Sequence, residues 1–301
     1  MEIAAKTQLE GINSKALAKG RRKEGRLFFN LALPSLIIIM IVVFIPVFWL
    51  SSLSFFDRAD ELSWVNYDRI FQSQLYIKTF IVTLKISFIV LFFCILLGYP
   101  LCYWLSQLPD RIAGILMVFV LLPFWTSILV RTYAWLVILQ RKGLINQWGI
   151  ELGLWDTPLR LVHNLNGTLI GMAHIMLPFL LLPLYGSMRT IDQDYIKAAS
   201  NLGASPFRAF WSIYFPLSLP GLFAGIVVVF VLCLGFFVTP AVLGGGRIIM
   251  VSMKIETIID LFYNFGTASA LGVVLLALTL IVLFISHKLL RLDKVLGGTG
   301  T

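Results

Sequence analysis

The sequence predicts an all-α integral membrane protein with six transmembrane helices. Hydrophobic residues make up 59% of the 301 residues and charged residues only 13%, and the mean hydropathy is +0.91, far from the balance of soluble domains. A span needs about 20 apolar residues, and lipid-facing backbone must satisfy its own hydrogen bonds, so each long apolar run predicts a helix. The apolar runs cover residues 29–53, 76–105, 112–139, 168–188, 222–243 and 267–290.

The loops between these runs differ in their content of Lys and Arg. Positive residues gather in the N-terminal tail, the 189–221 loop and the C-terminus, and fewer lie in the loops that alternate with them. The positive-inside rule therefore predicts that both termini and the 189–221 loop face the cytoplasm. The net charge of +9 then reflects topology and attraction to membrane lipid, and nucleic acid is the weaker alternative as a partner.

This topology divides the chain into five parts. A basic cytoplasmic tail over 1–28 precedes a first transmembrane helix over 29–53, which we expect to be a retained signal anchor. A periplasmic loop over 54–75 leads into a membrane core over 76–290. Residues 291–301 are predicted to form a second cytoplasmic tail.

Residues 197–216 form a polar segment between apolar runs. Tyr195, Ala199 and Leu202 fall at near-helical spacing. Gly203 follows them, at the place where a helix C-terminus favours a residue that tolerates positive φ. The first helix of this loop is therefore predicted to end at Gly203.

A second short amphipathic helix is predicted to follow. Ser205 offers an N-cap oxygen, and Pro206 suits the first helical position. Aromatic residues then recur at helical spacing, namely Phe207, Phe210, Trp211 and Tyr214. Pro216 and Pro220 predict a break before the next span, because proline lacks an amide donor and clashes with the preceding turn.

Several kinds of chemistry have no support in the sequence. No GxxxxGK[ST] phosphate loop occurs, so the chain is not expected to hydrolyse ATP. His163, His174 and His287 are scattered, with no HExxH motif or carboxylate cluster, and we expect satisfied or interfacial histidines rather than metal ligands. No cofactor or metal is predicted on this chain, and it is not expected to be an enzyme.

No Asp or Glu falls inside a predicted span. Proton-coupled and sodium-coupled carriers commonly use intramembrane carboxylates, which change charge or supply oxygen ligands to the coupling ion. Their absence argues against a secondary transporter. The energy for any transport must then come from elsewhere, and the 189–221 loop is the obvious place to receive it.

The loop carries a pattern made by Ala198, Ala199, Gly203, Ile213 and Pro216. This pattern resembles the EAA loop of ATP-binding-cassette (ABC) importer permeases, whose short coupling helices sit in a cleft of the ATPase subunit. Further segments resemble the spermidine/putrescine branch of that family: LGYPLCYWL from Leu97, LLPFWTSILVRTYAW from Leu121, LPFLLLPLYGSM from Leu177 and FFVTPAVLGGG from Phe236.

The resemblance implies a type I importer of the bacterial inner membrane. In such an importer this permease pairs with a second, similar permease, an ABC ATPase dimer and a periplasmic substrate-binding protein, and the ATPase subunits use the ATP. The implied substrate is a polyamine. The alternatives are another small amine, opine or amino-acid-like substrate, or a self-sufficient channel that conducts without ATP or partners.

The resemblance also implies a coupling role for the loop. Ala198, Ala199 and Gly203 would allow close helix approach. An aromatic set would anchor the loop in the ATPase groove, namely Phe207, Phe210 and Trp211. The alternative is an interfacial helix that lies on the membrane, which the aromatic face would also suit.

Two residues depart from the family pattern in this loop. Lys197 stands where the family usually has Glu, and Phe215 replaces the usual Leu before Pro216. We expect Gly203 and Pro216 still to place the backbone. A salt bridge from the usual Glu is lost, so either the ATPase carries a complementary acid or the contact is apolar.

Lys85 and Arg131 lie inside predicted spans. A cation facing lipid at mid-span costs roughly 2.5–3.5 kcal/mol on insertion scales, so each side chain should snorkel, pair with an acid of the second permease, or face the translocation path. Facing the path would repel a polyamine. Either the second permease then supplies acids while Trp125, Tyr133 and Trp135 offer cation–π surfaces, or the substrate is zwitterionic or anionic.

Overall fold

The computed structural model describes residues 29–57 and 61–297, with side chains described as far as residue 288. Over this part the named elements are all helices, and one isolated β-bridge joins Phe56 and Leu62. The predicted all-α class is confirmed. The predicted tail over 1–28 lies outside the described residues. Residues up to Leu53 form one compact unit and residues from Ser54 onward a second.

In its described residues, the first unit is the helix Phe29–Leu53, whose bounds coincide with the first apolar run of the sequence. Its 25 residues give a length of roughly 37 Å at 1.5 Å per residue, enough to cross the hydrocarbon of a bilayer. None of its apolar window is buried. A helix that is apolar on all sides and unburied suits a lipid environment.

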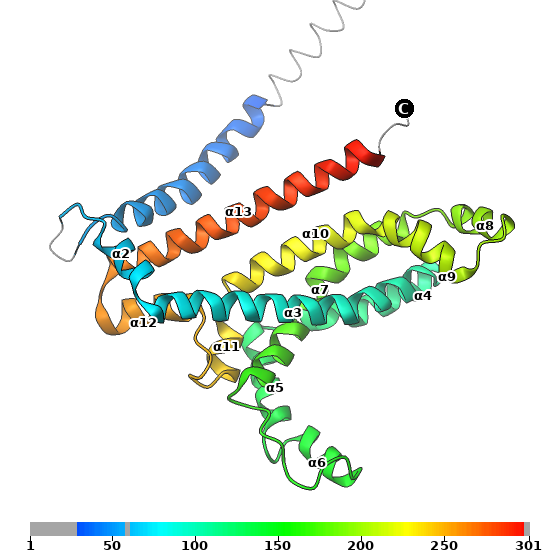
Figure 1. Ribbon diagram of the computed structural model, residues 1–301, viewed down its shortest axis with the longest axis horizontal. Coiled ribbons are helices and arrows are strands. Elements are labelled where there is room, and N and C mark those ends of the chain that lie inside the picture. Colours follow the sequence, from blue (N-terminus) through cyan, green and yellow to red (C-terminus); the bar gives the residue numbers. More distant parts are fainter. Residues whose placement is uncertain (1–28, 58–60, 298–301) are drawn as a thin grey trace, which may run out of the picture. The chain divides into compact units, whose positions relative to one another are not determined.

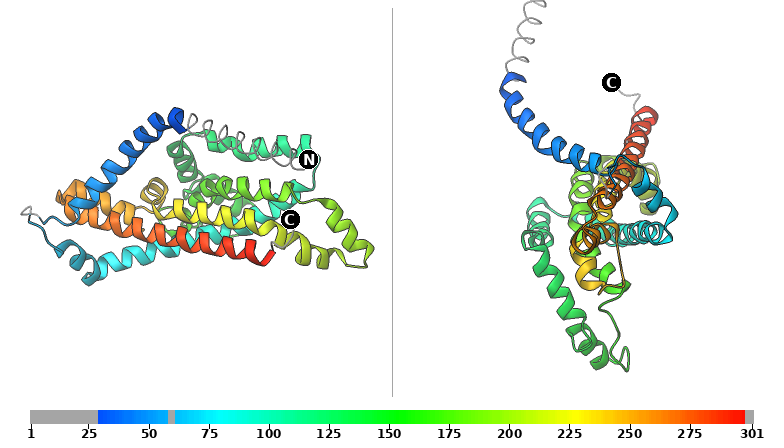
Figure 2. Two further views of the ribbon diagram at one scale, coloured as in Figure 1. Left: turned by 90° about the horizontal axis from the view of Figure 1, so that it is seen from above. Right: turned by 90° about the vertical axis from the view of Figure 1, so that its left-hand side faces the viewer.

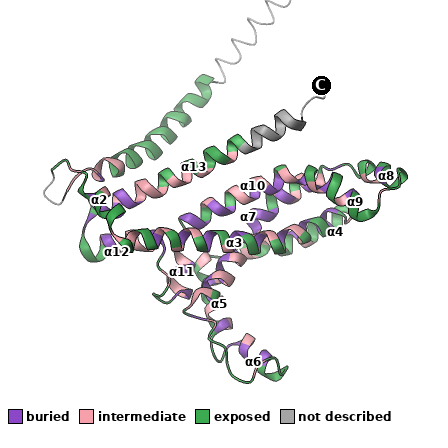
Figure 3. Ribbon diagram, viewed as in Figure 1, coloured by how far each residue is buried: buried purple, intermediate pink, exposed green. Residues whose placement is uncertain are grey.

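The second unit is organised around long helices that pack on one another, namely α3 (Gln74–Ser106), α7 (Leu165–Arg189) and α10 (Phe215–Leu234). Figures 1 and 2 show them side by side. Buried residues concentrate on α7 and α10 (Figure 3). The main hydrophobic core of this unit therefore lies where these helices meet.

Helices α7 and α10 approach closely at two glycines of α10. A Cβ atom added at Gly225 would lie 2.9 Å from Leu180 Cδ1 and 3.0 Å from the Leu180 carbonyl oxygen. A Cβ atom at Gly221 would meet Ser187 and the Pro183 carbonyl. Small residues at such a contact let helix backbones pack without intervening side chains.

A second, smaller core joins the ends of three other helices, α2 (Val65–Gln72), α12 (Val251–Phe262) and α13 (Phe265–Gly297). Polar contacts reinforce it: Arg69 Nη1 donates to Thr267 Oγ1 at 3.1 Å, and Thr267 Oγ1 donates to Asn66 Oδ1 at 2.9 Å. Helix α13 continues to Gly297. The residues from 291 onward, which were predicted to form a cytoplasmic tail, therefore begin as a continuation of this helix, and the candidate span itself ends at Lys288.

The third predicted span, 112–139, is not one helix. It consists of α4 (Asp110–Leu121), the 3₁₀ turn η1 (Leu122–Trp125) and α5 (Ile128–Leu139), and α6 (Leu144–Glu151) follows. The halves Asp110–Trp125 and Ile128–Glu151 meet at 95°. The chain turns because Pro123 lies in the tight turn and Thr126 and Ser127 have extended ψ angles of 152° and 139°.

The fifth predicted span, 222–243, is wrong at both ends. One continuous helical stretch runs from Pro206 to Leu234 through α9 (Pro206–Ala209), the π-helical turn η2 (Phe210–Tyr214) and α10. The wide turn η2 precedes Pro216, so the missing amide donor falls where regular helical bonding is already interrupted. At the other end the helix stops at Gly235, and α11 (Val238–Leu243) is a separate helix.

In the described residues, five helices are long and apolar enough to cross a membrane, or up to six if the bent pair counts as one span. The continuous ones contain no Asp or Glu, as the sequence predicts. The three cysteines in this part of the chain are free and buried.

Candidate functional site

The first candidate site is the loop that joins α7 to α10. It begins with α8 (Gln193–Asn201), whose N-cap residue Asp192 accepts a hydrogen bond from the Asp194 amide at 2.9 Å. Lys197 and Asp194 form an exposed ion pair at 2.8 Å, and this hydrogen bond raises the pKa of Lys197. Lys197, which replaces the acid expected here, thus has an acidic partner within its own helix.

The end of α8 is a Schellman turn built on Gly203. The Gly203 amide donates to Ser200 O and the Ala204 amide to Ala199 O, both at 3.0 Å. Gly203 has φ +83°, and a Cβ atom added there would meet no other atom within 4 Å. The predicted helix end is confirmed, and the position needs glycine for its backbone angle rather than for space.

The chain then enters α9 as the sequence predicts. Ser205 Oγ accepts a hydrogen bond from the Arg208 amide at 3.3 Å, and Pro206 lies in the first turn. The prediction of a separate short helix is wrong, because α9 continues through η2 into α10. Helix α8, Gly203 and α9 form an elbow at one end of the long helices (Figure 1), which we call the α8–α9 elbow.

The α8–α9 elbow exposes a set of large apolar side chains. Leu202 is 89% exposed and Phe207 74% exposed, Tyr195 is also exposed, and Trp211 is exposed in the adjoining turn η2. The small residues behave differently: Ala199 is buried, whereas Ala198 is exposed. Exposed apolar residues that converge on a short turn are typical of a docking surface.

Phe210 does not belong to this exposed set, which corrects its predicted place in an outward anchor. It packs edge-on against Tyr103 of α3 at a centroid distance of 5.2 Å and stacks on Tyr214 at 5.9 Å. Because of the π-helical turn, Phe210 and Tyr214 face α3. Leu202 takes the outward position instead, and its place directly before Gly203 is the sequence signal that could have identified it.

A polar cluster ties both ends of this loop to α3 and α4. Arg189 Nη1 donates to Ser106 O at 2.8 Å and Leu108 O at 2.9 Å, and Arg189 pairs with Asp110. The Tyr214 hydroxyl lies 2.6 Å from Ser106 Oγ. Hydrogen bonds therefore join both ends of this loop to α3 and the segment after it, and an ion pair joins Arg189 to α4. The sequence interpretation missed this cluster, since Arg189 counted there only as a loop charge.

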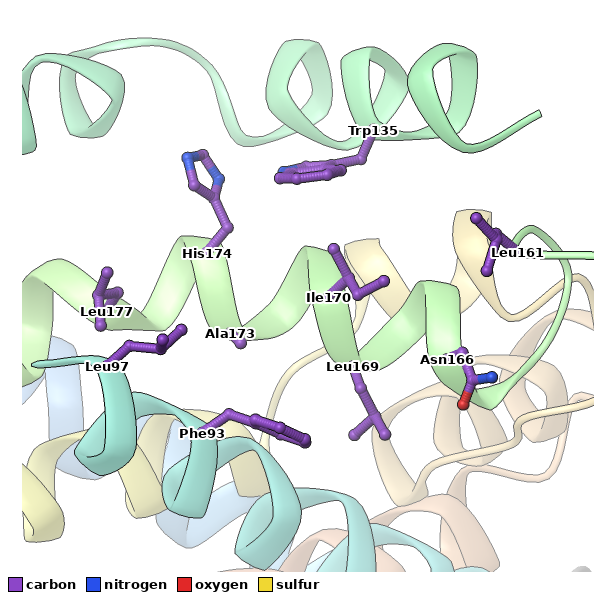
Figure 4. A pocket seen from close by; sticks show the side chains of 10 residues that line it. All are labelled: Phe93, Leu97, Trp135, Leu161, Asn166, Leu169, Ile170, Ala173, His174 and Leu177. Atoms are coloured by element: carbon purple, nitrogen blue, oxygen red, sulfur yellow. The ribbon is translucent and has the colours of Figure 1, made fainter. Parts of the chain in front are cut away.

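The second candidate site is a cavity of about 550 Å³ between α3, α5 and α7. Its walls are mainly apolar, with Trp135, His174 and Asn166 as its polar members. Figure 4 shows the ring of Trp135 beside that of His174, and their centroids are 5.5 Å apart. An apolar chamber with few polar groups suits a small ligand with an aliphatic body.

Unpartnered nitrogen atoms lie next to this cavity. Within the described chain, Arg131 Nε and Nη1 and His174 Nδ1 are buried without hydrogen-bond partners. Arg131 lies one helical turn before Trp135 and within electrostatic range of His174. His174 Nδ1 therefore has no hydrogen-bond partner within the described chain, which differs from the expectation of a satisfied histidine. Buried polar atoms without partners favour a site completed by a ligand or another subunit.

The other predicted path residues lie elsewhere. Of the predicted set, Trp135 lines the cavity and Arg131 adjoins it. Trp125 is 86% exposed at the bend between α4 and α5, Tyr133 is exposed on α5, and Lys85 is exposed on α3. The structure does not bring these three residues into the cavity.

The fold and the two sites define the class of the protein. Several helices are long and apolar enough to cross a membrane, α3, α5 and α7 line a cavity, and the Arg189 cluster connects the loop that carries the elbow to α3 and α4. No group of His, Cys, Asp or Glu residues in the described part of the chain could hold a metal ion. The chain is thus a transport subunit in a membrane.

Comparison with known proteins identifies the family. Residues 23–292 match the family model described as "Binding-protein-dependent transport system inner membrane component", and the chain belongs to this family. It is a multi-pass inner-membrane permease of the ABC importer type, and it is not the ATPase.

Individual relatives agree with this assignment. The chain is 33% identical over 258 residues to the spermidine/putrescine transport system permease protein PotB of Haemophilus influenzae, covering 83% of this chain and 90% of the relative. It is 31% identical over 263 residues to PotB of Escherichia coli, covering 84% and 95%. A solved bacterial alginate ABC transporter in complex with a periplasmic protein is similar in fold, with a TM-score of 0.71 and 17% identity over 93% of this chain and 98% of that chain.

Proposed function

We propose that this permease forms half of the pathway of an ATP-driven polyamine importer. The α8–α9 elbow carries the proposal, because it is an exposed apolar surface linked by hydrogen bonds to membrane helices. A second, similar permease would form the other half, an ABC ATPase dimer would bind the elbow, and a periplasmic substrate-binding protein would deliver the substrate. The likeness to PotB supports spermidine or putrescine as the substrate class.

Coupling would proceed through the elbow. In the proposed orientation, the elbow and the C-terminal end of α13 face the cytoplasm. The ATPase dimer closes on ATP and carries Leu202 and Phe207 with it, and the Arg189 cluster passes the movement to α3 and α4. The helices would then alternate between inward-open and outward-open arrangements. ATP would be used by the ATPase, and this chain would bind no cofactor.

The cavity between α3, α5 and α7 is the proposed part of the pathway on this chain. The face of Trp135 attracts an ammonium group by its ring quadrupole, and Leu97 and Leu177 line the space for the aliphatic body. Arg131 repels the same ammonium group, so an acid of the second permease would have to neutralise it. Lys85, Trp125 and Tyr133 are exposed, and the second permease could cover them.

Uptake by the complete importer tests the proposed substrate. We expect proteoliposomes with both permeases, the ATPase and the binding protein to import putrescine only when ATP is present on the ATPase side of the membrane. Ornithine is putrescine with one added carboxylate, and it should be imported at least about tenfold more slowly, because a buried charge without a partner is costly. Flux through this chain alone would instead support a self-sufficient channel.

The variant Arg131→Ala separates the two possible roles of that cation in the same assay. If Arg131 is neutralised by the second permease, putrescine uptake falls because an acid is left unpaired, and ornithine uptake stays low. If the wild type instead imports ornithine well and Arg131→Ala loses only this uptake, Arg131 recognises a substrate carboxylate. That result would contradict the polyamine assignment.

The backbone angle at Gly203 provides a further prediction. Gly203→Val should strain the elbow by about 1–2 kcal/mol, because L-residues other than Asn and Asp avoid this left-handed region. We expect about a tenfold lower recovery of the ATPase with the tagged permease. Gly203→Asn is the matched control, since Asn tolerates positive φ, and it should retain the complex. Equal recovery with Val and Asn would contradict a role for this turn.

A further inference from the structure

A second cavity, of about 490 Å³, lies where three loops meet. Arg141 follows α5, Arg160 and His163 precede α7, and Arg247 follows α11. No acidic residue lines this cavity. Three arginines from separate loops thus line one hollow.

The positive charges of this cavity are not neutralised within the described chain. The ion pairs found in that part join Arg189 to Asp110 and Lys197 to Asp194, and neither involves the cavity. Like charges that share a cleft raise the local potential and attract an anion. The planar guanidinium fork matches a carboxylate with two parallel hydrogen bonds, which favours carboxylates among possible ligands.

A buried asparagine holds two of the arginines in place. Asn146 Nδ2 donates to Gln140 O and to Leu159 O, both at 3.0 Å, and Asn146 Oδ1 accepts from the Leu159 amide at 2.8 Å. These bonds tie together the segments that carry Arg141 and Arg160. The side chain of Asn146 is fully buried, so the distance between the two segments is fixed by the fold.

The third segment packs closely against the side chain of His163 at Gly245. His163 has φ +57° and Gly245 has φ +55°. A Cβ atom on Gly245 would lie 2.5 Å from His163 Nδ1, so only glycine lets the Arg247 loop approach this closely. A left-handed residue that is not glycine or asparagine costs free energy, and such residues concentrate at functional sites.

We propose that this arginine cavity receives an acidic side chain of the periplasmic binding protein and guides its docking. The inference rests on the proposed function, which places these loops on the periplasmic side. A polyamine cannot be the ligand, because the arginines repel it. The binding protein would approach this face of the permease from the periplasm, and a carboxylate on its docking surface would be complementary to the three arginines.

The affinity of the binding protein for the assembled importer in nanodiscs tests the proposal. Arg141, Arg160 and Arg247 are each changed to Gln, singly and together, and the Kd is measured at low and high salt. The combined variant should weaken binding about 10-fold to 100-fold at low salt, chiefly through slower association, and should lose most of the salt dependence. Lys142→Gln is the matched control, since Lys142 is an exposed neighbour that does not line the cavity.

An unchanged Kd in the combined variant, or an equal loss in Lys142→Gln, would overturn the proposal. Nanodiscs with and without phosphatidylglycerol distinguish a lipid phosphate as the ligand. If the arginine variants alter only the dependence on this lipid and leave the Kd unchanged, the proposal is wrong. Polyamine uptake by the wild type is measured separately. If uptake fails but binding of the binding protein depends on the three arginines, only the proposed substrate is refuted. If uptake is normal but this binding does not depend on the arginines, only the present inference is refuted.

Discussion

Changing both Leu202 and Phe207 to Asp is expected to release the ATPase from the importer. These two side chains are the most exposed large apolar groups of the α8–α9 elbow. Truncation of a central interface residue typically costs about 2 kcal/mol or more, and placing a carboxylate in an apolar groove adds its desolvation cost. Together the changes should lower ATPase recovery with the tagged permease by about 100-fold or more.

The control for this experiment is Leu154→Asp. Leu154 is 67% exposed and follows α6 by a few residues, and α6 lies away from α8 and α9 in Figure 1. This variant should retain the ATPase. If the ATPase is fully recovered with the double variant, the elbow does not bind it. That result would support the alternative in which the elbow lies on the membrane surface, which its aromatic residues also suit.

The second large effect is expected at Gly225. In Gly225→Leu, the new side chain would have to enter the contact between α10 and α7, where even a Cβ atom would lie 3.0 Å from the Leu180 carbonyl oxygen. The Leu180 backbone cannot move aside as a flexible side chain can, so α7 and α10 must separate. Overpacking of this kind costs about 1–3 kcal/mol or more, and we expect a Tm several degrees lower for the purified permease.

A glycine in open space provides the comparison. Gly272 lies in α13 with nothing within 4 Å of a Cβ position. Gly272→Leu therefore makes the same change of residue type as Gly225→Leu but creates no clash. Its Tm should stay near the wild-type value. If both variants lose similar stability, Gly225 is not needed for the close contact between α7 and α10.

Much of the local structure of the elbow could be predicted from the sequence. Gly203 and Ser205 act through bonds within a few residues, so the helix end and the following N-cap follow from residue type alone. The position of Phe210 could not be predicted. Its spacing fits a regular amphipathic helix, and the π-helical turn that directs it toward Tyr103 depends on packing against α3.

The same limit applies to the membrane helices and their sites. Apolar run length identifies a span because crossing the hydrocarbon requires about 20 predominantly apolar residues. It does not show that the third run bends by 95° at Thr126 and Ser127. That bend decides which side chains of α5 meet α7, and so why Trp135 lines the cavity while Trp125 does not.

The sequence alone determined that this chain is a helical membrane protein with a helix end at Gly203, because hydropathy and turn residues act over short distances, and its resemblance to known permeases indicated the family. The tertiary structure alone decided which residues share a site. The cavity beside His174, the Arg189 cluster and the arginine cavity each join residues far apart in the chain, and only helix packing brings such residues together.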